Sequence, residues 1–181
     1  MRKLALLFLS VSLVCFVGAG YLVWQRYYNP NRLAFATSPP SAAPVVRYQS
    51  FWPARIQIPD LQIDLPVEPA EIKNGQWQVT SRGVSYLVSS PPPGQPGNSI
   101  FYGHNWPRLL GRLKNIRVGQ SIILEASSGS QLKFTVARIQ IVPPSDTSVL
   151  LPTIEPQLTL YTCIGFSDSK RLVVTALPQE P

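Results

Sequence analysis

The run Leu158-Thr159-Leu160-Tyr161-Thr162-Cys163 alternates between leucine and other side chains and ends in a cysteine. Alternation of this kind is typical of a β-strand with two different faces. The two leucines share one face, whereas Tyr161 and Cys163 belong to the opposite face. Gly165 follows closely, so we expect the strand to end at the cysteine. A strand end is a place where a rigid scaffold can present a reactive side chain.

Arg171 follows this cysteine after a short loop, residues 164–170, and begins another alternating run, residues 171–175. Adjacent antiparallel strands joined by such a loop bring the Arg171 guanidinium beside the Cys163 thiol. Lys170 has the opposite parity and is expected on the other face. Arginine also suits a planar, carboxyl-like oxyanion better than lysine, because its five donors form a rigid fork.

His104 is the only histidine of the chain. It follows an apolar run, residues 99–102, and a glycine, so we expect it where a strand passes into a loop. Cys15 lies in an apolar N-terminal stretch, which leaves Cys163 without an intrachain disulfide partner. A thiol to attack, an imidazole to move protons and a cation to stabilise an oxyanion are the parts of a cysteine acyl-transfer site. The competing interpretation is that the cysteine is merely buried and the histidine merely hydrogen-bonded.

The remainder of the chain from about Pro53 to Ala176 consists of short alternating runs separated by Gly, Pro, Asn and Ser. The predicted strands are 55–58, 61–67, 76–79, 84–88, 99–102, 121–125, 131–142, 158–162 and 171–175. Asn74-Gly75 is a strong hairpin signal, and residues 106–116 predict one short helix or a 3₁₀ turn. Nineteen prolines disfavour long helices. The sequence therefore predicts an all-β domain, a closed or nearly closed barrel rich in antiparallel pairs.

Residues 4–24 carry no formal charge. As a helix they would span about 31 Å, close to the ~30 Å hydrocarbon core of a bilayer. Trp24, Tyr27 and Tyr28 fit the aromatic belt of a membrane interface. The small residues 18–20 leave cleavage as a signal peptide open, and we favour an uncleaved anchor.

The chain divides into an N-terminal membrane anchor or signal segment (1–25), a flexible Pro/Ser/Ala linker (26–52) and a folded domain (53–181). Residues 38–44 are the low-complexity centre of the linker, which we expect to be extended. Positive charges on the two sides of the helix are nearly equal in number, so the positive-inside rule does not decide which way the helix would cross the membrane. We place the protein in the cell membrane as a single-pass protein with its folded domain outside, because that domain has the character of an exported one.

The charge balance excludes some functions. Sixteen Lys and Arg oppose nine Asp and Glu, and setting aside Arg2, Lys3 and Arg26 leaves 13 against 9. This mild excess fits ordinary solubility or an anionic surface. Nucleic acid is disfavoured as a partner by the expected exported topology, and the sequence has no basic helix or recognised nucleic-acid module. One histidine and scattered carboxylates predict no metal site and no cofactor.

Gly103-His104, residues 159–163 and residues 171–174 together resemble the signature of sortases, the membrane-anchored cysteine transpeptidases of bacterial surfaces. The resemblance covers roughly residues 53–177. It implies a closed eight-stranded β-barrel with one or two short helices. It also implies that Cys163 is the nucleophile, His104 the general acid/base and Arg171 the group that holds the oxyanion or positions the substrate.

The substrate that the resemblance implies is a secreted protein with a C-terminal sorting signal, commonly of the Leu-Pro-x-Thr-Gly kind. The enzyme would form a thioester and pass the acyl group to an amine of peptidoglycan or of a protein lysine. In sortases the loop corresponding to residues 142–152 shapes the recognition groove. We therefore expect Val149, Leu150, Leu151 and Thr162 to contact the substrate, although the loop residues could equally pin the loop to the core.

The main alternative function is a membrane-anchored, non-catalytic β-domain that binds a cell-wall component or a partner protein. Wall transpeptidases that act between D-amino acids are disfavoured, because their Ser-His-Gly-Cys-x-Arg string is absent from the sequence. Papain-like wall hydrolases place the cysteine before the histidine, which is the reverse of the order here.

Overall fold

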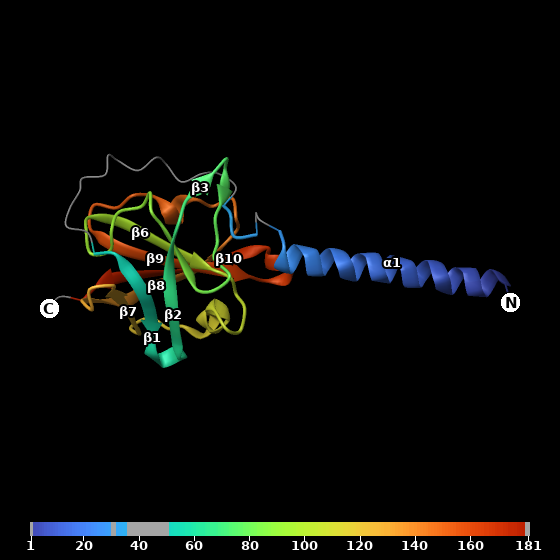
Figure 1. Ribbon diagram of the computed structural model, residues 1–181, viewed down its shortest axis with the longest axis horizontal. Coiled ribbons are helices and arrows are strands. Elements are labelled where there is room, and N and C mark those ends of the chain that lie inside the picture. The colour runs from blue at the N-terminus through green and yellow to red at the C-terminus, as the bar shows by residue number, and fades with distance from the viewer. Residues whose placement is uncertain (1, 30–31, 36–50, 180–181) are drawn as a thin grey trace.

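The computed structural model describes residues 2–29, 32–35 and 51–179, with the side chains of residues 2 and 5 excepted. Its elements are α1 (Arg2–Tyr27), β1 (Pro53–Ile58), η1 (Pro59–Leu61), β2 (Ile63–Ala70), β3 (Ile72–Lys73), β4 (Gln76–Trp77), β5 (Val84–Leu87), β6 (Gly97–Gly103), η2 (Leu110–Asn115), β7 (Ser121–Ala126), β8 (Gln131–Val142), η3 (Ser148–Leu150), β9 (Pro156–Ile164), η4 (Phe166–Asp168) and β10 (Lys170–Pro178), where η marks a 3₁₀ turn. Figure 1 shows α1 running away from the strands as a single long helix.

The long strands close into a barrel in the order β1-β2-β5-β6-β9-β10-β8-β7, and β3 and β4 form a separate hairpin. Two neighbouring pairs, β2 with β5 and β6 with β9, are parallel, and the other pairs in the barrel are antiparallel. Closure leaves no unpaired edge on the main sheet. The predicted closed, eight-stranded, antiparallel-rich barrel is confirmed.

The barrel wall separates two apolar clusters. Leu158 and Leu160 of β9 pack inside the barrel, whereas Tyr161 and Cys163 pack on its outer face, as the alternation predicted. The outer cluster comprises Leu33, Phe35, Ala70, Trp77, Leu87, Ile100, Tyr102, Val142, Leu150, Tyr161, Cys163 and Val173. The central strands β6, β9 and β10 are therefore buried on both faces.

Two local differences from the sequence expectations have simple causes. The predicted strand at residues 61–67 begins only at Ile63, because Pro59 opens a 3₁₀ turn and Gln62 takes a left-handed conformation (φ 51°). The predicted strand at 76–79 is limited to Gln76–Trp77, the second arm of the Asn74-Gly75 hairpin. The short turn expected within residues 106–116 is present as η2.

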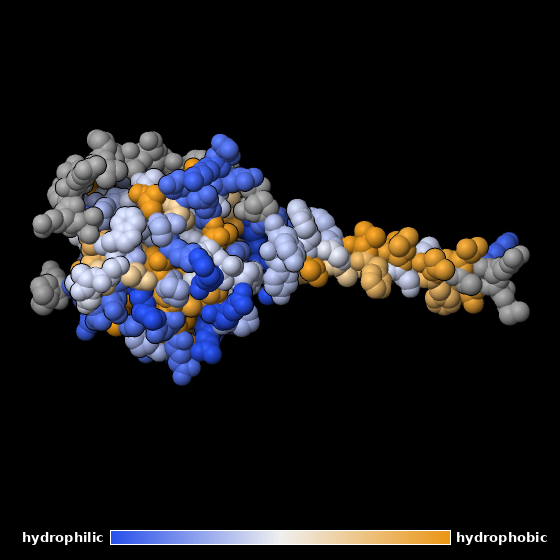
Figure 2. Space-filling model, viewed as in Figure 1, coloured by the Kyte–Doolittle hydropathy of each residue, from blue (hydrophilic) through white to orange (hydrophobic). Residues whose placement is uncertain are grey.

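Within the described residues, one helix segment, Leu6–Tyr27, is long and apolar enough to cross a membrane, with a mean hydropathy of 2.3. Its side chains face outward along almost its whole length, and Figure 2 shows the hydrophobic surface of α1 beside a largely hydrophilic barrel. The low-complexity centre of the predicted linker, residues 38–44, lies outside the described residues.

Asn98 fastens the β8–β9 loop to the barrel. Its buried side chain accepts a hydrogen bond from the Thr159 hydroxyl (2.7 Å) and donates to the carbonyls of Val149 and Leu151 (3.2 Å each). We predict that Asn98→Ala lowers the free energy of unfolding by about 2–4 kcal/mol, because the substitution leaves buried polar groups unpaired.

Urea unfolding of the full-length protein in detergent micelles, followed by tryptophan fluorescence, measures this loss. The exposed Ser128→Ala in the β7–β8 turn is the control and should change stability by less than about 0.5 kcal/mol. Equal stability of the two variants would contradict the role of Asn98.

Candidate active site

The register of β6, β9 and β10 brings the three predicted catalytic residues to one end of the barrel. Arg171 lies directly opposite Cys163 in the antiparallel β9–β10 pair. In the parallel β6–β9 pair Gly103 lies opposite Thr162, so His104 leaves its strand beside Cys163. The predicted strand-to-loop position of His104 is also observed, because β6 ends at Gly103.

A four-residue stretch, Arg32–Phe35, covers this end of the barrel; we call it the plug segment. Its first three carbonyls are each bound by a side chain of the site. The Cys163 thiol donates to the carbonyl of Arg32 (3.1 Å), the Tyr161 hydroxyl to that of Leu33 (3.3 Å) and Arg171 Nη2 to that of Ala34 (2.7 Å). The thiol is therefore engaged with the plug segment.

The plug segment also differs from the sequence expectation for residues 26–52. We expected a flexible linker, but Leu33 and Phe35 are 1% and 4% exposed and belong to the outer apolar cluster. Two large apolar residues, Leu33 and Phe35, alternate with the small Ala34 and can bury one face of the segment against the barrel, which is the physical reason for the difference.

Arg32 anchors the plug segment by its side chain. Its guanidinium forms an ion pair with Asp168, donates to the Asn105 side-chain oxygen (2.6 Å) and donates to the Arg26 carbonyl at the end of α1. Asn105 in turn donates to Asp168 (3.1 Å). Both Arg32 and Asp168 are largely buried, so each charge depends on its partner.

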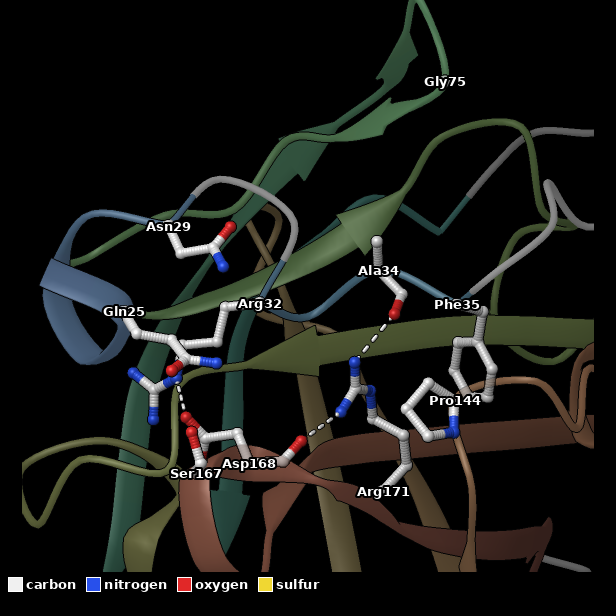
Figure 3. Close-up of a pocket in the computed structure, with 10 residues that line it drawn as sticks. All are labelled: Gln25, Asn29, Arg32, Ala34, Phe35, Gly75, Pro144, Ser167, Asp168 and Arg171. Carbon is white, nitrogen blue, oxygen red and sulfur yellow. Dashed lines mark hydrogen bonds and ion pairs between the residues drawn. The ribbon is translucent and has the colours of Figure 1, made fainter. Parts of the chain in front are cut away.

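A cavity of about 490 Å³ lies beside these groups, lined by Gln25, Asn29, Arg32, Ala34, Phe35, Gly75, Pro144, Ser167, Asp168 and Arg171. Figure 3 shows the Arg171 guanidinium reaching both the Ala34 carbonyl and the Asp168 backbone carbonyl (2.9 Å). Arg171 Nε is buried without a hydrogen-bond partner among the described atoms. Among the described residues no group of three or more His, Cys, Asp and Glu could hold a metal ion.

Burial keeps the thiol and the imidazole uncharged in this state. Burial raises the pKa of the Cys163 thiol to about 11, although the nearby Arg171 opposes the shift. Burial also lowers the pKa of His104 to about 4, and the Arg32 charge lowers it further. At pH 7 only about one Cys163 in ten thousand would then be a thiolate.

The His104 ring stacks face to face on Trp106, with centroids 4.3 Å apart and planes within 5°. The backbone of both residues is held by η2. The Leu110 amide donates to the His104 carbonyl (3.1 Å), and the Gly111 amide donates to the Trp106 carbonyl (2.9 Å). A Cβ at Gly111 would lie 2.7 Å from that Trp106 oxygen, so only glycine fits there. Trp106 also contacts Tyr27 at the end of α1 (5.8 Å between centroids).

The four residues predicted to contact the substrate occupy different environments. Leu150 is buried in the outer cluster, Val149 packs against that cluster, and Leu151 is 49% exposed. Thr162 is buried, and its hydroxyl donates to the Gly103 carbonyl (2.7 Å), so in this state it links β9 to β6.

Sequence reasoning missed Arg32, Asn105, Trp106 and Asp168. Asn105 and Trp106 directly follow the single histidine, and that proximity is the only signal that could have indicated them. Asp168 lies in the β9–β10 loop and Arg32 in the predicted linker, where isolated charges are normally solvent-exposed.

We predict that the double variant Leu33→Ala, Phe35→Ala accelerates alkylation of Cys163 by iodoacetamide at pH 7 by at least about tenfold, because weakened apolar burial releases the plug segment. Release also removes the desolvation that raises the thiol pKa, so the pH midpoint of the reaction should move below about 11.

The measurement uses full-length protein in micelles with Cys15→Ala, which leaves Cys163 as the only cysteine. Ile154→Ala, which removes an apolar side chain that is 88% exposed, is the matched control. An unchanged rate and midpoint in the double variant would show that the plug segment does not shield the thiol.

Comparison with known proteins gives a consistent picture. The sortase domain family model matches residues 56–179. Sortase A from Corynebacterium diphtheriae is 24% identical, over 90% of this chain and 84% of that chain, with a TM-score of 0.63. A lid mutant of that sortase A is 25% identical, over 91% and 95%, with the same TM-score.

The complex of Streptococcus agalactiae sortase C1 and MTSET is 23% identical, over 70% of this chain and 67% of that chain, with a TM-score of 0.59. A comparison with curated proteins gives no match. The matched region contains the barrel except the first half of β1, and it includes Cys163, His104 and Arg171. This chain belongs to the sortase family.

Proposed function

We propose that this protein is a cysteine transpeptidase that cleaves the C-terminal sorting signal of secreted proteins and transfers the acyl group to an amine. The observation that carries the proposal is the strand register that sets Arg171 opposite Cys163 and releases His104 beside them. The sorting signal is of the Leu-Pro-x-Thr-Gly kind. The accepting amine belongs to peptidoglycan or to a lysine of a pilin-like subunit.

In the first half of the reaction the Cys163 thiolate attacks the scissile carbonyl carbon and forms a tetrahedral intermediate. His104, as imidazolium, then gives a proton to the leaving amine, the carbon–nitrogen bond breaks and a thioester remains. In the second half an amine attacks the thioester, His104 takes its proton and the thiolate leaves. The thioester keeps the acyl group activated, so no ATP is needed.

Arg171 stabilises the oxyanion or holds the substrate backbone. Its Nη2 already binds a peptide carbonyl, that of Ala34, which supports this role. A substrate would replace the plug segment and supply its own carbonyl. The fixed guanidinium then faces charge that develops on oxygen, in a site that contains little water.

The plug segment must leave before the substrate enters. The burial of Cys163 comes in part from Leu33 and Phe35, which are joined to the barrel only through the chain and non-covalent contacts. This arrangement favours the enzyme over a non-catalytic β-domain with a permanently buried cysteine. Opening exposes the thiol and the imidazole to water. The pKa of Cys163 then falls and the pKa of His104 rises, so the two values approach each other.

The remaining assignments follow from the same proposal. Residues 1–25 are the anchor, 26–52 the linker that carries the plug segment, and 53–181 the catalytic domain, on the outer side of the membrane. Val149, Leu150 and Leu151 lie on the loop that closes the outer cluster, which supports a role in shaping the substrate groove. Thr162 supports the site by linking β9 to β6.

We predict that Cys163→Ala abolishes cleavage of a Leu-Pro-x-Thr-Gly peptide and that Arg171→Lys lowers kcat/KM by about 100-fold or more. Lysine keeps the charge but loses the fork that binds carbonyl oxygens. Full-length protein in micelles, the peptide and a panel of amines are combined, and mass spectrometry detects the ligated product.

Circular dichroism of both variants checks that the barrel is intact, and the Leu33→Ala, Phe35→Ala protein is assayed in parallel so that closure cannot hide activity. Turnover by Cys163→Ala, or absence of product with every amine from the opened protein, would sink the proposed transpeptidase.

We further predict that Trp106 positions the His104 ring and keeps it dry. Trp106→Ala admits water, which favours the imidazolium, so the pKa of His104 should rise from about 4 toward its ordinary 6.5. kcat should fall by about tenfold or more, because the ring loses its fixed orientation.

The chain has a single histidine, so one ¹³C-labelled imidazole resonance reports this titration without ambiguity. Trp106→Phe retains an aromatic face and serves as the control, with a pKa and kcat near those of the native protein. A purely structural role would reduce the amount of folded protein in Trp106→Ala without moving the titration midpoint.

A further inference from the structure

Two large apolar side chains of the barrel domain are almost fully exposed. Among the described residues outside α1, Ile154 (88%) and Phe166 (86%) are the only large apolar residues that are more than four-fifths exposed. They lie in the loops before and after β9, whose nine residues separate the two loops by about 30 Å. A single exposed apolar residue is ordinary on a protein surface, so its surroundings decide its meaning.

Phe166 lies beside α1, the helix that is apolar enough to cross a membrane. A cavity of about 320 Å³ lies between the β9–β10 loop and the last turns of this helix. Phe166 and Asp168 line the cavity from the loop, and Leu22 and Arg26 line it from the helix. Figure 1 shows the turn between β9 and β10 at the side of the barrel from which α1 leaves. Ile154 precedes β9 and lies at the opposite end of that strand.

The end of α1 is tied to the barrel beside this loop. Arg32 links the two, because its guanidinium pairs with Asp168 and donates to the Arg26 carbonyl. The Tyr27 ring packs near Trp106, with centroids 5.8 Å apart. Two separate contacts therefore set the position of the loop along the helix axis.

The loop that presents Phe166 has a fixed backbone. The Asp168 amide donates to the Gly165 carbonyl (3.2 Å), and the Asp168 carbonyl accepts a hydrogen bond from Arg171 Nη1 (2.9 Å). Ser167 and Asp168 have left-handed backbones (φ 51° and 59°), which cost free energy for residues other than glycine. The apolar ring of Phe166 is thus held outside the barrel by a well-defined turn.

The depth of Leu22 places this loop at a bilayer interface. Leu22 belongs to the apolar segment Leu6–Tyr27, whose 22 residues span about 33 Å as a helix. This length matches the ~30 Å hydrocarbon core of a bilayer and places Trp24 and Tyr27 near its boundary. Leu22 lies about 7.5 Å before Tyr27 along the helix axis. A loop that faces Leu22 and Arg26 therefore lies at the level of the lipid headgroups.

We infer that the β9–β10 loop is a second membrane contact of this protein, in which Phe166 inserts into the interfacial region of the bilayer that α1 crosses. Arg26 and Lys170, both exposed, suit the phosphate groups of phospholipids at the same level. The contact holds the end of the barrel that carries Cys163 against the membrane surface. The inference rests on the membrane anchor of the proposed function and goes beyond it, since an anchor helix requires no contact between the barrel and lipid.

Fluorescence quenching in lipid nanodiscs measures this contact. The full-length chain, with Cys15→Ala and Cys163→Ala, carries an NBD fluorophore on Phe166→Cys or on the control Ile154→Cys. The nanodiscs contain phosphatidylcholine and phosphatidylglycerol, with or without lipids that are spin-labelled near the headgroup. We expect quenching at position 166 to exceed quenching at position 154 at least about threefold, because an interfacial side chain lies within about 5–10 Å of the headgroup boundary. Both native side chains are exposed, so neither substitution disturbs the core.

A second pair of proteins tests the Phe166 side chain itself. The fluorophore is placed on Ser169→Cys, at an exposed position of the same loop, and is measured with and without Phe166→Ser. Loss of the ring should reduce the quenching at least about twofold, since the loop loses its apolar contact with lipid. Thermal melting of each protein confirms its fold.

Equal quenching at positions 166 and 154, or quenching at position 169 that Phe166→Ser leaves unchanged, would overturn the lipid contact. A fluorophore on the native Cys15, in the middle of α1, separates this result from failure of the anchor. Quenching at Cys15 by lipids spin-labelled deep in their acyl chains, without quenching at position 166, overturns only the loop contact. An unquenched Cys15 overturns the anchor, and the loop contact with it.

Discussion

The pairing of β9 with β6 on one side and β10 on the other is the constraint on which the rest of the site depends. Because both faces of β9 are buried, the leucines fix its register from inside the barrel while Tyr161 and Cys163 are set on the outside. A slip by one residue would exchange the two faces and bury the sulfur in the barrel. The same register sets Arg171 opposite Cys163, and the parallel pairing with β6 delivers His104.

The stability of the closed state is the balance of favourable and unfavourable free-energy contributions of similar size. Burying Leu33 and Phe35 is worth about 3–6 kcal/mol together. Ordering the four backbone residues of the plug segment costs about 4–8 kcal/mol. The three carbonyl hydrogen bonds add about 1 kcal/mol each. The buried Arg32–Asp168 pair adds little beyond its own desolvation cost. These terms nearly cancel, so the plug segment is suited to reversible opening.

Much of the fold could be predicted from the sequence, because β-barrel strands reveal themselves by alternation and by turn residues such as Asn74-Gly75. The position of Arg171 beside Cys163 could also be predicted, since a short loop joins their two strands. The docking of the plug segment could not be predicted, because it depends on tertiary contacts with β9 and β10, more than 120 residues away. In the sequence, Leu33 and Phe35 resemble apolar residues of a linker. The stacking of Trp106 on His104 and the ion pair of Asp168 with Arg32 could not be predicted for the same reason.

Only four residues separate Arg32 from Tyr27 at the end of α1, so the two residues lie at most about 18 Å apart. After release, the plug segment therefore stays tethered close to the end of α1. Its return is a unimolecular event at an effective local concentration that linker geometry sets, in the millimolar range for short tethers. An incoming peptide competes with the plug segment at this local concentration, which does not depend on the total concentration of the protein. Under the proposed function, weakly binding peptides are thereby excluded from the site by the protein's own plug segment.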